Sequence, residues 1–366
     1  MCLSGSLDPA WVQSTAARAA DRLLSHPWKV WFWGDSIGIE GLLDAAELTG
    51  NPSYFRFVQG LFAGWLAREA ARSAFDYTLP GVALLRVYQQ TGELRLLDAA
   101  LRHAEYMQGF RQTEHGAYVL YENAAIELPP ELPRDHPDYR SQTSKVANGG
   151  ACVFVDSVHF DGPFFAKAYQ VTGEDRFRRL ALDNILPQIE LLFDEEEDLF
   201  HHFWMENTGR RNGVLWGRGN GWGLLGLTST LQFLPPSDAD AGRLIEVLQR
   251  LARRLRSLQT PDGGWHTILD DPESYIETSI AAFVVDGFAT AIGRGWLDRD
   301  GYLPVVHSAL ALLRQHVQAD GRLAGVSYET FPSTRRQHYR EMPRDAVVPW
   351  GQGPLLTALR ACTRYD

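Results

Sequence analysis

The chain has 366 residues, of which 45% are hydrophobic and 22% are charged, so it is long and apolar enough to bury a sizeable core. Its formal net charge is −10, from 35 basic and 45 acidic residues, and it contains no run of four basic residues. This pattern argues against broad binding to nucleic acid or to an anionic membrane. Cys2, Cys152 and Cys362 are too few and too widely spaced for a disulfide framework or a structural zinc site.

The sequence carries no recognisable targeting or membrane-spanning segment. It begins MCLSGSLDPAW, which lacks the basic segment and apolar run of a signal peptide. No stretch of about 18 apolar residues follows. We therefore expect a soluble protein of the cytoplasm.

Apolar residues recur at spacings of three and four along much of the chain, which is the period of amphipathic helices. An alternation of period two, which would indicate strands, is scarce. The sequence therefore predicts a mainly helical protein. The clearest helical segments are 16–24, 42–48, 55–66, 82–88, 97–107, 164–169, 180–192, 244–258, 280–291 and 305–317.

A Thr-Gly pair ends three of these helical regions, at 49–50, 91–92 and 172–173. The pairs are separated by 42 and then by 81 residues, so the second gap is close to twice the first. Glycine can adopt the left-handed conformation that ends a helix, and the next helical segment begins a few residues later. One helical hairpin per ~40 residues is the pattern of a repeat architecture.

Repeated hairpins can form an open solenoid or a closed ring. Long segments rich in aromatic residues and glycine, at 111–156, 199–222 and 262–278, join the hairpins and gather Trp, His, Asp and Arg. Such segments suit loops around one end of a closed ring. We therefore predict an all-α (α/α)6 barrel that spans residues 1–366 as a single catalytic domain. The proline-rich, polar stretch at about 124–150 is predicted to be a long surface loop.

Two aspartates precede apolar helical segments in different hairpins. Asp156 lies in CVFVDSVHF directly after three apolar residues, where desolvation would raise its pKa and suit a general acid. Capping of the following helix is an equally good interpretation. Asp76, in FDYTLPGVALL, is on its own better explained as a turn or cap residue. A barrel could bring both to one end, and paired carboxyl groups suit sugar chemistry.

The segment LWGRGNGWGLL carries Trp216, Arg218 and Trp222 among four glycines. Tryptophan faces stack on sugar rings, and arginine pairs with a carboxylate through two hydrogen bonds. Buried structural tryptophan is the competing interpretation. Trp33, in WFWGDSIG, is a weaker stacking candidate, as are Trp265 and Trp350. His202, in LFHHFWMEN, has no acidic partners at metal-binding spacing, so we do not expect a metal there.

The order of these motifs resembles that of the unsaturated glucuronyl and rhamnogalacturonyl hydrolases, glycoside hydrolase families 88 and 105. The similarity covers roughly residues 28–360, and its most specific parts are FVDS and the Trp-x-Arg-x-x-x-Trp segment. It implies an (α/α)6 barrel that removes a 4,5-unsaturated uronic acid from the non-reducing end of lyase-made oligosaccharides, with no cofactor. The residues implied are Asp156 as acid/base, Asp76 as second carboxylate, Trp216, Arg218 and Trp222 in stacking and carboxylate binding, and His202 nearby. Trp33 is kept beside them as a further substrate-binding candidate.

The chain departs from the family pattern in two places. Phe154 stands where the family commonly has a tryptophan two residues before the acid/base, so the indole N–H is absent. The interval between Asp76 and Asp156 also looks longer than usual. Both differences fall where neighbouring sugars would lie, so they bear on which substrate is accepted.

Two other functions are compatible with the same barrel. A sugar 2-epimerase would need two histidines, for which His159, His202 and His266 are available, although its motifs are absent. A carbohydrate-binding or helical-repeat scaffold would have kept the barrel without catalysis. An epimerase would interconvert sugars without bond cleavage, and a scaffold would bind without turnover.

Overall fold

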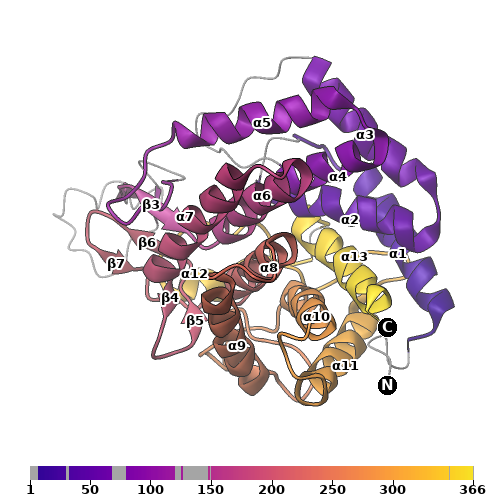
Figure 1. The fold of residues 1–366 in the computed structure, drawn as a ribbon. Helices are drawn as coiled ribbons and strands as arrows, with labels where there is room; N and C mark the ends of the chain where they lie inside the picture. The colour runs from indigo at the N-terminus through magenta and orange to yellow at the C-terminus, as the bar shows by residue number, and fades with distance from the viewer. Residues whose placement is uncertain are drawn as a thin grey trace.

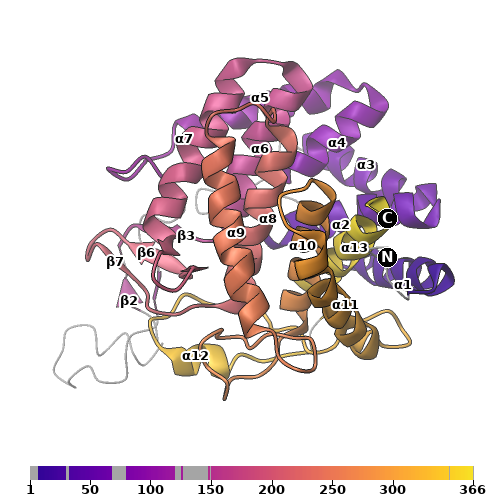
Figure 2. The ribbon, with the colours of Figure 1, turned by 60° about the horizontal axis from the view of Figure 1, so that its bottom comes forward.

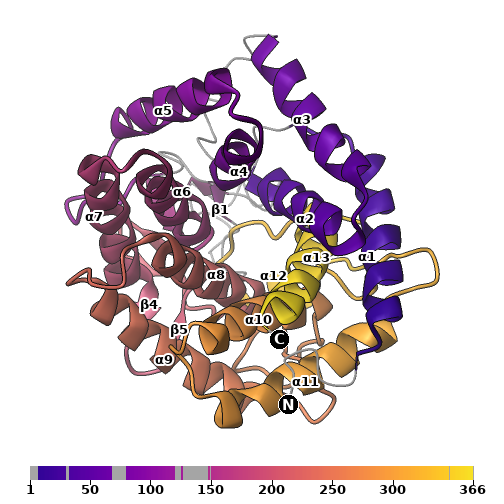
Figure 3. The same ribbon diagram turned by 45° about the vertical axis from the view of Figure 1, so that its right-hand side comes forward.

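The computed structural model describes residues 7–29, 33–67, 80–119, 125–126, 147–148, 150–345 and 347–365. Their helices form two concentric rings (Figures 1 and 3). The inner ring consists of α2 (Trp33–Thr49), α4 (Gly81–Thr91), α6 (Ser157–Thr172), α8 (Gly217–Phe233), α10 (Thr278–Gly293) and α13 (Pro349–Arg364). The outer ring consists of α1 (Pro9–Leu24), α3 (Pro52–Ala67), α5 (Leu94–Gln108), α7 (Asp175–Leu192), α9 (Ala241–Leu258) and α11 (Arg299–His316).

Each inner helix packs against the next, and α13 packs against α2, so the ring is closed. Every outer helix packs against an inner helix next to it in the chain. This is an (α/α)6 barrel, which confirms the predicted fold class. One further short helix, α12 (Arg336–Arg340), lies in the long connection before α13.

Within the described ranges, the periodicity revealed all six outer helices and four of the six inner helices. In α9, Leu244, Leu248, Leu251 and Leu255 form one buried stripe. All ten predicted segments fall in helices, and the last of them runs one residue past the end of α11. Helices α8 and α13 were not predicted, because their first turns (GRGNGWG and PWGQGP) are rich in glycine and proline, which are poor helix formers. The end of segment 199–222 is therefore the start of α8 rather than a connection.

Glycines allow the inner helices to approach one another closely. A Cβ at Gly226 of α8 would lie 2.3 Å from the carbonyl oxygen of Val158 in α6. A Cβ at Gly353 of α13 would lie 2.4 Å from the carbonyl oxygen of Ile37 in α2. Real Cβ atoms do not approach a carbonyl oxygen so closely, so glycine at these positions sets the spacing of the ring.

The three Thr-Gly pairs end inner helices as predicted. Gly50, Gly92 and Gly173 have φ angles of 67°, 70° and 73°, in the left-handed region. The preceding threonine hydroxyls donate to the carbonyl oxygen four residues earlier and accept from the backbone N–H two residues later. The same capping arrangement therefore recurs at the ends of α2, α4 and α6.

Short antiparallel strands lie in the connections before inner helices, toward one end of the barrel with α12 (Figure 2). One sheet has the order β3 (Cys152–Phe154), β6 (Phe203–Met205) and β7 (Arg210–Arg211). Two-stranded sheets pair β4 (Phe193–Asp194) with β5 (Leu199–Phe200), and β1 (Ala125–Ile126) with β2 (Ala147–Asn148). The rest of the predicted 124–150 loop falls almost wholly outside the described residues. Within the described ranges, no helix is both long and apolar enough to cross a membrane.

Gly353→Ala tests the close packing that closes the ring. The new methyl group would clash with the backbone of α2, so we expect a loss of about 1–3 kcal/mol of the free energy of unfolding, measured by urea denaturation. Gly242→Ala in α9 is the matched control, because a Cβ added there would have no atom within 4 Å. The control should be neutral or stabilise by up to about 1 kcal/mol. Equal effects of the two changes would contradict this account of ring closure.

Candidate active site

The N-terminal ends of the inner helices meet at one end of the barrel, which we call the mouth. Trp33 is the first residue of α2, and its ring lies 4.9 Å from that of Trp350 at the start of α13 and 6.4 Å from that of Trp222 in α8. Asp156, Trp216 and Glu277 occupy the N-cap positions of α6, α8 and α10. The candidate residues that the structure describes therefore come together from separate hairpins.

Asp156 is positioned by the pairing of two short strands. Strand β3 pairs with β6 in a register that sets Phe154 opposite Phe203, and the N–H of Val155 donates to the carbonyl oxygen of His202 at 2.9 Å. Asp156 follows directly, and its side chain makes no capping hydrogen bond to α6. Asp156 thus stands at the N-cap position, but its side chain does not cap the helix through a hydrogen bond. Its side chain is 13% exposed, and Oδ2 lies 3.8 Å from Nε2 of His202.

His202 is held by a buried hydrogen-bond network that reaches α12. Its Nδ1 lies 2.6 Å from the hydroxyl of Tyr339, and that hydroxyl lies 3.1 Å from the carbonyl oxygen of Ser333. The Asn212 side chain donates to both the Ser333 carbonyl and the Tyr339 hydroxyl. The imidazole ring also lies against Trp216, with centroids 4.3 Å apart. These contacts fix the orientation of the nitrogen that faces Asp156.

The surroundings of His202 favour the neutral imidazole. Burial is the main cause, and the nearby charges of Arg218 and His338 add to it, so the pKa of His202 lies well below its ordinary value. A neutral imidazole carries one proton and one lone pair. It can therefore share a hydrogen bond with the carboxyl group of Asp156 without adding positive charge.

Arg218 is fully buried and pairs with Glu277, which is also fully buried. Its Nη1 also donates to Ser327, and its Nη2 donates to the carbonyl oxygen of Tyr328 and to the hydroxyl of Thr330. The Nε atom is buried and has no hydrogen-bond partner in the described part of the chain. The guanidinium therefore ties α8, α10 and the 327–330 segment together, and one of its donors remains available.

The three predicted tryptophans differ in exposure. Trp33 is partly exposed, whereas Trp216 and Trp222 are 1% and 0% exposed. Trp216 packs on His202 and Arg218, and Trp222 packs on Phe283. Their ring faces are covered, in agreement with the structural interpretation left open by the sequence. Both indole N–H groups are nevertheless buried without a hydrogen-bond partner among the described residues.

Glu277 and Tyr339 were not singled out from the sequence as site residues. Tyr339 reaches His202 because two ion pairs hold α12 against the 270–271 turn, between Arg336 and Asp270 and between Arg340 and Asp271. The hydrogen bond of Arg340 is also the first cause of the lowered pKa of Asp271. No local pattern marks a contact between residues 137 positions apart.

The remaining candidates have structural surroundings or fall outside the described part. Asp76 lies outside the described residues. The indole N–H groups of Trp265 and Trp350 donate to backbone carbonyl oxygens of Leu255 and Ser327. His266 contacts the carbonyl oxygen of Ser274, and His159 packs beside Trp222. Across the described ranges, no group of three or more His, Cys, Asp or Glu residues is arranged to hold a metal ion.

The closed double ring and a partly exposed carboxyl group beside a neutral imidazole define a barrel enzyme of the (α/α)6 class. The sequence model of Glycosyl Hydrolase Family 88 matches residues 9–365, so the chain belongs to that family and is a glycosidase. This confirms the resemblance drawn from the motifs.

Curated relatives carry related names. The chain is 27% identical over 355 residues to "Unsaturated rhamnogalacturonyl hydrolase YesR" of Bacillus subtilis (strain 168), covering 93% of this chain and 92% of that protein. It is 28% identical over 242 residues to "Unsaturated 3S-rhamnoglycuronyl hydrolase" of Formosa agariphila, covering 63% and 64% of the two chains. The family is thus shared, whereas the named substrates differ among its members.

Solved structures share the fold. A possible member of the GH105 family from Klebsiella pneumoniae superposes with a TM-score of 0.85 at 21% identity, covering 99% of this chain and 95% of that one. Unsaturated glucuronyl hydrolase from Bacillus sp. GL1 superposes with a TM-score of 0.70 at 20% identity, covering 96% of each chain. The barrel architecture is therefore common to these proteins.

Glu277→Gln tests the buried ion pair. The substitution would leave the charge of Arg218 buried without its partner, so we expect the free energy of unfolding to fall by about 3–5 kcal/mol in urea denaturation at neutral pH. Glu273→Gln is the control, because the Glu273 side chain is 81% exposed in its ion pair with Arg340. That change should have almost no effect. A similar loss of unfolding free energy in both variants would contradict a particular contribution of the buried Arg218–Glu277 pair to stability.

His202→Gln tests the charge state of the imidazole. The folded pKa is lowered, so below about pH 6.5 the unfolded chain binds a proton that the folded chain does not. His202 alone should therefore make stability fall with falling pH by about 1.4 kcal/mol per pH unit until the folded pKa is reached. We would measure the free energy of unfolding by urea denaturation between about pH 7 and pH 5. In the His202→Gln variant it should fall less steeply with falling pH than in the unchanged protein, by the contribution of one proton. An unchanged slope would mean that folding does not lower the pKa of His202.

Proposed function

We propose that this enzyme removes a 4,5-unsaturated uronic acid from the non-reducing end of short oligosaccharides made by polysaccharide lyases. The observation that carries the proposal is the partly exposed carboxyl group of Asp156, held at the mouth beside a neutral His202 in a family 88 glycosidase. The names of the relatives support the same substrate class.

The proposed chemistry begins with the enol ether of the unsaturated sugar. Asp156 in its acid form protonates C4, and positive charge develops on C5 and the ring oxygen. The Asp156 carboxylate then takes a proton from a water molecule as its oxygen bonds to C5. The resulting hemiketal opens to a ketone at C5, and the hemiacetal left at C1 releases the remaining sugar as an alcohol. Addition of water to a double bond thus breaks the glycosidic link, and Asp156 regains its proton.

The other site residues have proposed roles in binding. Trp33 offers the partly exposed ring among the three tryptophans. Trp216, Arg218 and Trp222 each keep a buried N–H donor without a partner in the described part of the chain, at the indole nitrogens and at Nε. Buried donors of this kind are costly unless a ligand accepts from them, which supports contact with substrate oxygens. Asp76 is proposed as the second carboxyl group because of the family motif alone.

The direction of the inner helices supports an anionic substrate. Trp33, Asp156 and Trp216 mark the N-terminal ends of α2, α6 and α8, where the helix dipoles place partial positive charge. A uronate carboxylate entering the mouth is favoured by these dipoles, and a neutral His202 does not compete with the acid for a proton. The same field would disfavour a cationic sugar.

The observed positions of the histidines favour hydrolysis over epimerisation. His202, His159 and His266 have different partners: Tyr339, the ring of Trp222 and the carbonyl oxygen of Ser274. A proton-abstracting pair of histidines would need to face one substrate from two sides. Residues 1–366 acting as one catalytic domain, and a cytoplasmic location, remain predictions of the sequence.

The direct test is ultraviolet absorbance of the conjugated double bond during incubation with unsaturated disaccharides from pectin, glycosaminoglycans and ulvan. We expect the absorbance to fall while a free reducing sugar is released from at least one member of the panel. If the absorbance does not fall and no reducing sugar is released with any member of the panel, the proposal is overturned. Interconversion of sugars without cleavage would favour the epimerase instead.

Asp156→Asn tests the acid. The amide keeps the shape of the side chain but cannot deliver a proton, so we expect turnover to fall by about 10²–10⁴-fold while the substrate still binds. Asp98→Asn is the control, since this aspartate is 60% exposed on the outer helix α5. Near-normal turnover in the Asp156 variant would remove it from the mechanism.

A further inference from the structure

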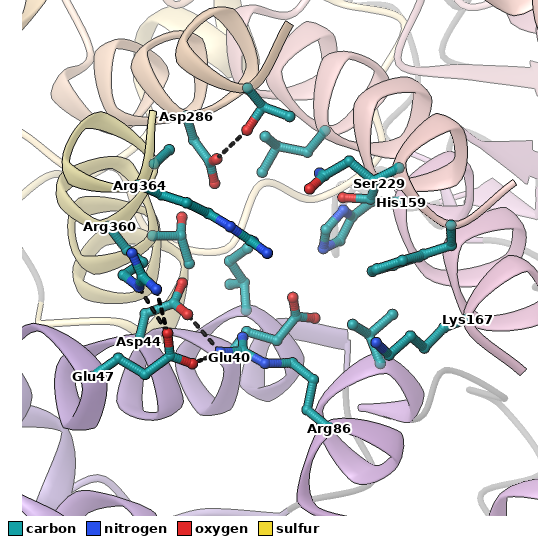
Figure 4. Close-up of a pocket in the computed structure, with 18 of the residues that line it drawn as sticks. Glu40, Asp44, Glu47, Arg86, His159, Lys167, Ser229, Asp286, Arg360 and Arg364 are labelled. Atoms are coloured by element: carbon teal, nitrogen blue, oxygen red, sulfur yellow. Dashed lines mark hydrogen bonds and ion pairs between the residues drawn. The ribbon is translucent and has the colours of Figure 1, made fainter. Parts of the chain in front are cut away.

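The barrel holds a cavity at the end opposite the mouth, and we propose that this axial cavity is a binding site for a small hydroxylated carboxylic acid, the chemical class of free sugar acids. The cavity measures about 310 Å³ and is lined by side chains from all six inner helices (Figure 4). The inference concerns binding alone, so it does not depend on the proposed reaction.

The axial cavity opens where the inner helices end and deepens toward their middle. Gln90, near the end of α4, and Arg294, just after α10, are exposed and lie at its rim. Lys167 and His159, both in α6, are 6% and 4% exposed and line its deeper part. The cavity is therefore a pit along the barrel axis rather than a shallow surface depression.

One wall of the axial cavity is neutralised by its own ion pairs. Arg86 contacts Asp44 at 2.6 Å and Glu47 at 3.2 Å. Arg360 also pairs with Glu47, through both Nε and Nη2. These four residues form a connected network on α2, α4 and α13, and its contacts are the dashed lines at the lower left of Figure 4. The network holds that wall in place and leaves little charge for a ligand.

Other charged groups around the axial cavity form no ion pair with a described residue, although the charge of Lys167 acts on Glu40 and that of Arg364 acts on Asp286. Glu40 and Arg364 make no hydrogen bond or ion pair with any described residue, and both extend toward the centre in Figure 4. Asp286 accepts a hydrogen bond from Thr290 at 3.5 Å and forms no ion pair within the described ranges. Lys167 donates to Gln170 and lies over the ring of Phe233. Two carboxyl groups and two cations in this part of the chain therefore face the cavity without ion pairs.

The pKa values of these groups agree with their burial without ion pairs. Burial raises the pKa of Glu40 to about 8 and that of Asp286 to about 7. Burial, with the charges of Arg86 and Arg364, lowers the pKa of Lys167 to about 8. A bound group that supplied the missing hydrogen bonds or charge would offset this cost.

His159 gives an independent indication of a ligand. Its side chain lines the cavity, and its buried Nδ1 has no hydrogen-bond partner within the described ranges. The ring packs against Trp222 with centroids 5.1 Å apart. Burial lowers the pKa of His159 to about 3, so the ring is neutral and can both donate and accept a hydrogen bond.

The arrangement matches a ligand that is acidic at one position and hydroxylated at others. A carboxylate would pair with the cations Lys167 and Arg364. Hydroxyl groups would donate to Glu40 and Asp286, and His159 would exchange a hydrogen bond with another. A simple anion would leave both carboxyl groups without donors, and a neutral sugar would leave both cations unpaired. A sugar acid supplies a carboxylate for the two cations and hydroxyl groups for the two carboxyl groups.

Titration calorimetry at neutral pH with D-galacturonate tests the proposal, with D-galactose and acetate as ligands that each lack one half of the required chemistry. We expect saturable binding of one galacturonate per chain, and binding of each partial ligand at least about tenfold weaker. Lys167→Met and Arg364→Met should each weaken galacturonate binding by about tenfold or more, because each removes a charged hydrogen-bond donor. Arg253→Met, an exposed position on the outer helix α9, should have no effect.

A Trp33→Ala variant separates this site from the mouth. Binding that survives Trp33→Ala and is lost in the Lys167 and Arg364 variants supports the axial cavity. Binding with the opposite dependence, no binding, or acetate binding as tight as that of galacturonate would overturn the proposal. The absorbance assay with unsaturated disaccharides reports the catalytic function separately, so either idea can fail alone.

Discussion

The ion pair between Arg218 and Glu277 is the constraint on which the architecture of the mouth depends. Both side chains are fully buried, so their charges are costly to desolvate and must satisfy each other. Arg218 uses its other donors to hold the 327–330 segment, and Glu277 also accepts from Ser279. One pair thereby joins the starts of two inner helices to a loop about 50 residues further along the chain.

The parallel direction of the inner helices gives the two ends of the barrel different electrostatic character. Backbone N–H groups face the mouth, where the carboxyl group of Asp156 lies, and carbonyl groups face the axial cavity. Among the described residues, five basic and four acidic residues line the axial cavity, so cations are in slight excess at the carbonyl end. Trp222 contacts Trp33 toward the mouth and His159 toward the cavity, so one aromatic layer separates the two environments.

The sequence revealed the fold through ten helical segments, six in outer and four in inner helices, and through its caps. Helix α9 has one apolar stripe and is recognisable, whereas α8 is surrounded by protein and glycine-rich, so it resembles a loop in sequence. The Thr-Gly pairs were informative because they report a local backbone conformation. Burial around an axis depends on all six hairpins together, and no window of sequence contains that information.

The candidate site was predictable where a residue stands beside a recognisable motif. Asp156 and His202 were identified in this way, and the strand pairing that brings them together joins segments about 50 residues apart. Tyr339 and the pairing of Glu277 with Arg218 depend on contacts between distant segments. The burial of Trp216 and Trp222 was likewise undecided by the sequence, because a tryptophan near glycines suits both a sugar platform and a core.

The packing of α13 against α2 has a consequence for how the chain folds. These helices are separated by about 300 residues, and Gly41 and Gly353 bring their backbones together. Each hairpin can form from local contacts as it leaves the ribosome, but the apolar flank of α2 has no cover until α13 has been synthesised. Ring closure therefore carries the largest entropy cost of loop closure, and it can occur only after the last inner helix has been made. Until α13 has been synthesised, the nascent chain can form only an open arc of hairpins, in which α2 lacks its contact with α13.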